Sequence, residues 1–127
     1  AGRKFEYLKE RMLGYEELMK LPVMCLEGNT STRTYVEQFL ASKQVTIRPE
    51  FELATSDMLI QFAVRNLGIA SVVRNFAEEH LTEGDLFELR FLEEIPARTF
   101  CIVANERIPL SAAAATLMNV LVQGTSQ

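Results

Sequence analysis

Short apolar runs bounded by proline and glycine constrain the fold of this chain more than any other feature of its sequence. Val23–Leu26 is a continuous apolar run between Pro22 and Gly28, and Ile69–Val73 is a mostly apolar run that follows Gly68. A strand that faces water on one side alternates apolar and polar residues, whereas a strand buried on both faces is apolar throughout. The sequence therefore predicts buried strands inside a sheet that is covered on both sides.

Helical segments separate these strands. A helix is predicted to begin near Ser31 and to run to about Ser42, where apolar residues recur at helical spacing. A second helix is predicted after the cap-forming residues Thr55–Asp57, closed by Asn66 or Gly68 in a left-handed conformation. Further strands are predicted at 45–53, 86–91 and 98–104, short helices at 15–20 and 75–80, and a last helix at 112–122, after an irregular segment at 1–14. This alternation predicts an α/β fold with a mostly parallel five-stranded sheet and helices on both faces.

Composition and charge narrow the classes of function. The chain has 127 residues, of which 48% are hydrophobic, and a net charge of −4. Basic residues near the N-terminus alternate with Glu6 and Glu10, which is typical of a solvated face rather than a nucleic-acid patch. No apolar run reaches the ~20 residues that span a bilayer, so we expect no membrane contact and a cytoplasmic location. Because Ala1–Lys4 contains neither an initiator Met nor a signal-peptide core, we expect a piece of a longer chain.

The sequence offers little catalytic chemistry. It lacks the GxGxxG and GxxxxGK[ST] patterns of nucleotide-binding loops. Its single histidine, His80, is interpreted as a surface residue near a helix C-terminus, and one His without a Cys pair does not predict a zinc site. Neighbouring carboxylates such as Glu78 and Glu79 point in different directions along a helix and are interpreted as solvated. We therefore expect no enzymatic activity, no cofactor and no metal ion.

Two isolated cysteines, Cys25 and Cys101, each lie inside an apolar run. Buried free cysteine behaves as a small hydrophobic residue, and the wide spacing excludes a CxxC motif. Both thiols are therefore expected in the core.

Hydroxyl and amide side chains follow two of the predicted strands. Ligands of open α/β folds bind beyond the carboxyl ends of the strands, and a helix N-terminus suits a carboxylate, phosphate or sulfate. Plain helix capping would use the same residue types, and it is the favoured interpretation at the second helix. At the first helix, capping and ligand contact remain equally open, because more polar residues occur in a row than one cap needs. The candidate residues are Asn29, Thr30, Ser31 and Thr32 at the first helix, and Thr55 and Ser56 at the second.

An ordered series of short motifs resembles the distal lobe of the effector-binding domain of LysR-type transcriptional regulators. The matching stretches are Leu21–Val23, Ser31–Arg33, Val36–Phe39, Ala54–Leu59, Val64–Ala70, Glu83–Leu86, Arg98–Val103 and Leu110–Ala113. The family often has Gly where Asn66 stands and Pro where Val73 stands.

The resemblance implies a fold like one lobe of type 2 periplasmic binding proteins. In that arrangement residues 1–20 lead into the lobe, residues 21–97 form it, and residues 98–127 return towards a proximal lobe outside this chain. The resemblance implies a small-molecule effector held between the two lobes, DNA bound by another domain, and ligand contacts at Asn29–Thr32 and near the third strand. The latter positions are Ala70, Ser71 and Val73. The apolar 112–122 helix is expected to pair with a second copy of the chain.

Other classes of function remain open beside this one. A solute-binding protein of a transporter would share the fold but would carry a signal peptide or a lipidated cysteine. An interaction domain without a ligand would leave the Asn29–Thr32 cluster as capping residues only.

Overall fold

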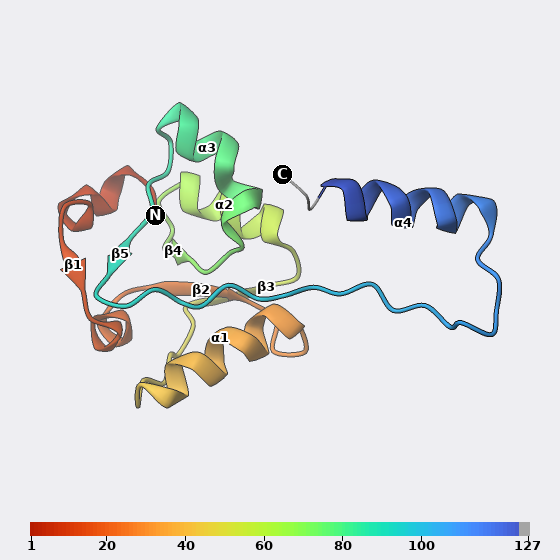
Figure 1. The fold of residues 1–127 in the computed structure, drawn as a ribbon. Helices are drawn as coiled ribbons and strands as arrows, with labels where there is room; N and C mark the ends of the chain where they lie inside the picture. The colour runs from red at the N-terminus through yellow and green to blue at the C-terminus, as the bar shows by residue number, and fades with distance from the viewer. Residues whose placement is uncertain (125–127) are drawn as a thin grey trace. The chain divides into compact units, whose positions relative to one another are not determined.

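The strand predicted at Val23–Leu26 forms at those residues and lies in the middle of a three-stranded parallel sheet (Figure 1). The computed structural model describes residues 1–124. The chain divides into two units, Ala1–Ile95 and Pro96–Gln127. In order, the elements are η1 (Arg3–Leu8), β1 (Met12–Leu13), η2 (Tyr15–Lys20), β2 (Val23–Leu26), α1 (Ser31–Ser42), β3 (Phe51–Leu53), α2 (Ser56–Val64), β4 (Ile69–Ala70), η3 (Arg74–Ala77), α3 (Glu78–Glu83), β5 (Arg90–Phe91) and α4 (Ala112–Gly124), where η marks a 3-10 helix.

β2 is buried on both faces, as its apolar run predicts. Successive side chains of a strand point to opposite faces, and here they enter two separate cores. Met24 and Leu26 pack on the side of α2, whereas Val23 and Cys25 pack on the side of α1. Figure 1 shows α1 and α2 on opposite sides of β2, so helices cover both faces of this sheet.

Local sequence signals account for the bounds of α1 and α2. The hydroxyl of Thr30 accepts a hydrogen bond from the Arg33 N–H at 3.3 Å, and Thr55 accepts one from the Met58 N–H at 3.3 Å. The end of α2 is marked by Asn66, whose φ of 62° is left-handed. The alternative, Gly68, has another role, because a Cβ there would lie 2.5 Å from the main-chain oxygen of Pro22. Gly68 therefore lets the end of α2 approach the segment before β2.

The prediction of one five-stranded sheet is wrong. The strands form two parallel sheets, one with the order β3-β2-β4 and one that pairs β1 with β5. The strands predicted at 45–53, 69–73 and 86–91 shorten to β3, β4 and β5. A segment forms a strand only where a neighbouring strand pairs with it through main-chain hydrogen bonds. The β-propensity of the segment alone therefore does not determine how long the strand is. The segment at 1–14, predicted to be irregular, contains η1 and the partner strand β1.

The predicted strand at 98–104 does not form, because within residues 1–124 no neighbouring strand pairs with it. Its apolar side chains are exposed, and Val103 retains 88% of its accessible surface. The prediction that both cysteines are buried is therefore half right: Cys25 is buried and Cys101 is exposed. Burial raises the pKa of the Cys25 thiol, and nearby Arg33 lowers it in part.

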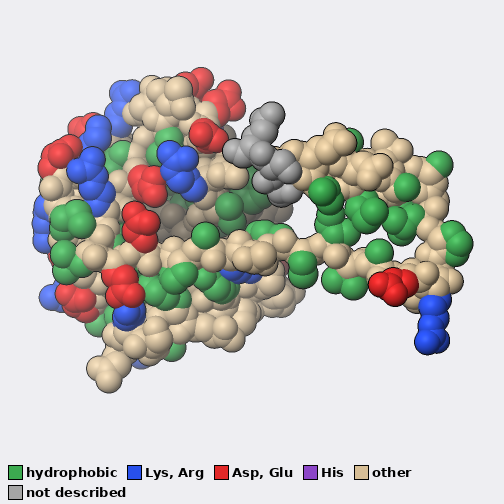
Figure 2. Space-filling view, in the orientation of Figure 1, with side chains coloured by type: hydrophobic (Ala, Val, Ile, Leu, Met, Phe, Trp, Pro, Cys, Tyr) green, Lys and Arg blue, Asp and Glu red, His purple; other side chains and the backbone are tan. Residues whose placement is uncertain are grey.

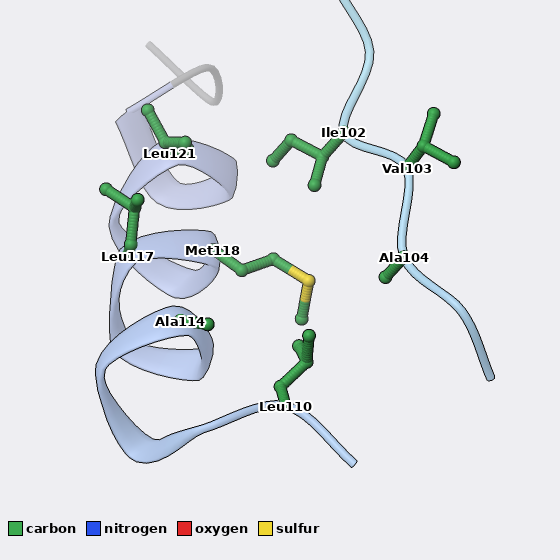
Figure 3. Close-up of a pocket in the computed structure, with 8 residues that line it drawn as sticks. All are labelled: Ile102, Val103, Ala104, Leu110, Ala114, Leu117, Met118 and Leu121. Atoms are coloured by element: carbon green, nitrogen blue, oxygen red, sulfur yellow. The ribbon is translucent and has the colours of Figure 1, made fainter. Parts of the chain in front are cut away.

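In the second unit, α4 and the extended segment before it place apolar side chains around a shared hollow (Figure 3). Leu110, Leu117 and Met118 line it together with Ile102 and Val103 across from the helix. None of the helices in residues 1–124 combines the length and the apolar character needed to cross a membrane.

Candidate functional site

Parallel pairing brings most of the candidate polar residues to one edge of the β3-β2-β4 sheet. Leu26 at the end of β2 lies opposite Leu53 at the end of β3, and the Glu27 N–H donates to the Leu53 oxygen at 3.0 Å. On the other side, the Ser71 N–H donates to the Met24 oxygen at 3.0 Å, so Ser71 extends the pairing of β4. The starts of α1 and α2 and the segment after β4 therefore share the carboxyl edge of this sheet.

At the first helix, Thr30 acts as the cap. Its hydroxyl accepts from Arg33 and donates to the main-chain oxygen of Glu27 at 2.9 Å. Both hydrogen bonds are local, so the Thr30 hydroxyl is already used in capping α1. Asn29 and Ser31 are exposed, and their side chains make no hydrogen bond within residues 1–124, whereas Thr32 is partly buried.

At the second helix, Thr55 is the cap, which agrees with the capping interpretation. Ser56 is the first residue of α2 and is partly buried. After β4, Ala70 and Ser71 are partly buried and Val73 is exposed. A ligand role for any of these residues stays a prediction.

From the sequence, Arg33 in the first turn of α1 could either add a charge at this edge or face solvent, and the structure buries it at the edge. Its side chain is only 10% exposed, and its Nη1 donates to the main-chain oxygen of Leu26 at 2.8 Å and to Glu52 Oε2 at 3.0 Å. Its Nε donates to Glu37 Oε1 at 2.7 Å. Burial lowers the pKa of this guanidinium, but the hydrogen bonds to Glu37 and Glu52 outweigh that effect and raise it. The i,i+4 spacing of Arg33 and Glu37 was visible in the sequence, but the contact with Glu52 depends on strand register.

Neither of two hollows in the described structure is lined by the candidate residues of this edge. One is the apolar hollow of the second unit (Figure 3), and the other is lined by residues such as Tyr15, Lys43 and Glu93. In the latter, Tyr15 donates to the main-chain oxygen of Glu93, and Lys43 forms an ion pair with the Glu93 carboxylate. The pKa of Tyr15 rises to about 12, mainly through burial and then through Glu93 and Glu94.

His80 is not the plain surface residue that the sequence indicated. It lies within α3, its side chain is only 23% exposed, and its Nδ1 lies 3.6 Å from Asp85 Oδ2. Elsewhere on the visible face of the first unit, acidic and basic side chains are interspersed, in keeping with a solvated surface (Figure 2).

Comparison with known proteins identifies the family. The model of the LysR substrate binding domain matches residues 6–126, nearly the whole chain. The chain belongs to the LysR substrate binding domain family. Membership in the LysR substrate binding domain family implies a fold of the type 2 periplasmic-binding-protein class, and the α/β arrangement with parallel strands agrees with it. It also favours the regulator interpretation over the transporter interpretation.

A curated relative of this LysR substrate binding domain is the HTH-type transcriptional activator CmpR of Synechocystis sp.. The two are 27% identical over 70 residues, which is 55% of this chain. The match spans 23% of the length of that activator.

Proposed function

We propose that this chain is the effector-sensing part of a LysR-type transcriptional regulator, and that it binds a small anionic metabolite at the carboxyl edge of the β3-β2-β4 sheet. The observation that carries the proposal is the convergence of two helix starts, α1 and α2, on that one edge. Open α/β folds bind ligands in this place, beyond the carboxyl ends of their strands.

The chemistry of the α1 start suits an anionic group. The first turn of a helix has main-chain N–H groups without helical acceptors, and the helix dipole adds partial positive charge. Asn29 and Ser31 are exposed beside it and can donate further hydrogen bonds. Because Glu37 and Glu52 already neutralise Arg33, N–H and hydroxyl groups rather than this guanidinium would hold the ligand.

Family membership supports a sensing role over catalysis or transport. In the proposed mechanism the effector lies between this lobe and a second lobe, which lies outside this chain. An effector that binds more tightly when the two lobes are closed on it shifts the protein towards that closed arrangement. This shift changes the populations of the DNA-bound states, whose DNA contact is made by a separate domain. The proposal includes a cytoplasmic location, because a transcriptional regulator acts where the DNA is.

The proposal includes self-association through α4. Leu117 and Val120 of this helix keep 59% and 60% of their accessible surface, and green apolar side chains gather in this unit (Figure 2). Exposed apolar surface of this kind marks interaction sites in soluble proteins.

A thermal-shift screen with carboxylates, phosphates and neutral polar metabolites tests the ligand proposal. We expect an anionic compound to raise the melting temperature, and Ser31→Ala to weaken its binding. Ser42→Ala at the other end of α1 is the matched control and should leave binding unchanged. Equal binding by both variants would place the ligand elsewhere.

The coding sequence upstream of Ala1 tests the regulator proposal independently. A winged helix-turn-helix and a first α/β lobe there would support it. A signal peptide or lipidation motif would replace it with the transporter interpretation.

A further inference from the structure

Three side chains with metal-binding chemistry meet where α3 ends. His80, Glu83 and Asp85 each offer one ligand atom, and these atoms all lie within 4.8 Å of one another. The sequence predicted no metal ion, because a lone histidine gives no ligand spacing. The cluster depends instead on how the chain turns after the helix.

A left-handed glycine produces the juxtaposition. Gly84 has a φ of 81°, which closes α3 and turns the chain back. The N–H groups of Asp85 and Leu86 both donate to the main-chain oxygen of His80, at 3.0 and 3.2 Å. These bonds hold Asp85 beside the imidazole, while Glu83 follows His80 by three residues on the same helix face.

The distance between His80 and Asp85 fits shared coordination better than a hydrogen bond. Nδ1 of His80 is buried and has no hydrogen-bond partner within residues 1–124. Asp85 Oδ2 lies 3.6 Å from it, beyond the ~2.7–3.2 Å of an N–H···O hydrogen bond. Zinc bonds of about 2.0–2.2 Å in a tetrahedral site put neighbouring ligand atoms roughly 3.3–3.6 Å apart.

We propose that His80, Glu83 and Asp85 bind a divalent transition-metal ion of the zinc type. An imidazole with two carboxylates suits zinc, cobalt or nickel, whereas magnesium and calcium prefer oxygen ligands alone. The partial negative charge at the C-terminal end of α3 also favours a cation. With three protein ligands the ion keeps an open coordination position, to be filled by water or by a ligand of another molecule.

Arg3 is the basic residue that competes with the metal. Its Nη2 lies 3.8 Å from Asp85 Oδ1, the oxygen that does not face His80. The Arg3 side chain is largely exposed, so this ion pair is weak and leaves Oδ2 available. Arg3→Gln should therefore tighten metal binding rather than weaken it.

Calorimetric titration of the chain with Zn²⁺ tests the proposal, with the visible absorption of Co²⁺ as a second readout. We expect one ion per chain and a tetrahedral cobalt spectrum. His80→Ala, Glu83→Gln and Asp85→Asn should each weaken binding at least about tenfold, since loss of a partner beyond the ligands alone costs about 10–100-fold.

Glu79→Gln is the matched control, because it removes the same charge as Glu83→Gln from an exposed position of α3 outside the cluster. It should leave zinc binding unchanged, and circular dichroism identifies any variant that fails to fold. Absence of zinc binding, or equal binding by the control and all three ligand variants, overturns the proposal and leaves His80 and Asp85 as neighbours without a role in metal binding.

Discussion

The Nη1 of Arg33 donates a 2.8 Å hydrogen bond to the main-chain oxygen of Leu26, which joins the first turn of α1 to the last residue of β2. The same nitrogen reaches Glu52 on β3 at 3.0 Å. One side chain thus ties a helix start to two strand ends at the carboxyl edge of the sheet. Arg33, paired with the carboxylates of Glu37 and Glu52, thus helps to hold in place the edge proposed for ligand binding.

Replacing this cation should destabilise the first unit. Arg33→Met keeps much of the apolar stem but removes three hydrogen bonds, of which one is to a main-chain oxygen. Because Glu37 and Glu52 are half exposed and can return to water, we expect a loss of only about 1–3 kcal/mol in the free energy of unfolding, measured with urea. Arg65→Met, at an exposed arginine, should change it by less than about 0.5 kcal/mol. Equal effects of the two substitutions would contradict the assigned role of Arg33.

Capping and ligand contact can be separated by substitution. Thr30→Ala and Thr55→Ala each remove a side-chain acceptor from a helix N–H and should cost about 1 kcal/mol of stability. Ser31→Ala removes an exposed hydroxyl without such a bond and should stay within about 0.5 kcal/mol. Thermal unfolding of the three variants measures the difference, and a Ser31 effect as large as that of Thr30 would show that Ser31 has a structural role.

The sequence predicted the elements whose cause is local. β2 and α1 form at the predicted residues, because a wholly apolar run and a threonine cap act within a few positions. Strand extent could not be predicted in the same way. The apolar segment 98–104 has the residues of a strand, but pairing depends on a neighbour that the local sequence does not specify.

In the candidate sites, too, features with a local cause could be predicted, whereas features that depend on distant parts of the chain or on an unusual turn could not. Capping by Thr55 follows from its position before α2, and was predicted. The burial of Arg33 was not, because it depends on the register that sets Cys25 beside Glu52. His80 and Asp85 meet through the left-handed turn at Gly84, a conformation that the sequence allowed without pointing to a site.

Alkaline pH should destabilise the fold through Tyr15. Its pKa rises from the ordinary value of 10.0 to about 12 in the folded chain, first through burial and then through Glu93 and Glu94. The unfolded chain therefore loses the phenol proton first, and stability falls as pH rises from 10.0 towards about 12. Denaturant unfolding across this pH range should show a smaller decrease in the free energy of unfolding for Tyr15→Phe than for the wild type. Parallel curves for the two proteins would contradict the raised pKa.

Replacing Gln44 and Asn66, two residues with a left-handed backbone, by glycine should change stability in opposite directions. Gln44 has a φ of 60° after α1, and its side chain is exposed, so Gln44→Gly should relieve backbone strain and stabilise the fold by about 0.5 kcal/mol. Asn66 has a φ of 62°, but its Oδ1 accepts a 2.9 Å hydrogen bond from the Lys4 N–H. Asn66→Gly should therefore cost about 1 kcal/mol. Urea unfolding of both variants measures the two signs, and stabilisation by Asn66→Gly would contradict the importance of that bond.

The exposed apolar face of α4, which includes Leu117 and Val120, should mediate self-association. Apolar surface removed from water contributes about 25 cal/mol per Å², so burial of Leu117 and Val120 against a second copy of the chain can drive dimer formation. A charge buried at the same contact opposes it. Sedimentation of the chain should show a dimer whose dissociation constant rises at least about tenfold in Val120→Glu, a change of about 1.4 kcal/mol. Asn119→Glu adds the same charge at the neighbouring exposed position and should leave the dimer intact. A wild-type chain that stays monomeric at every concentration, or equal weakening by both substitutions, would remove α4 as the contact surface.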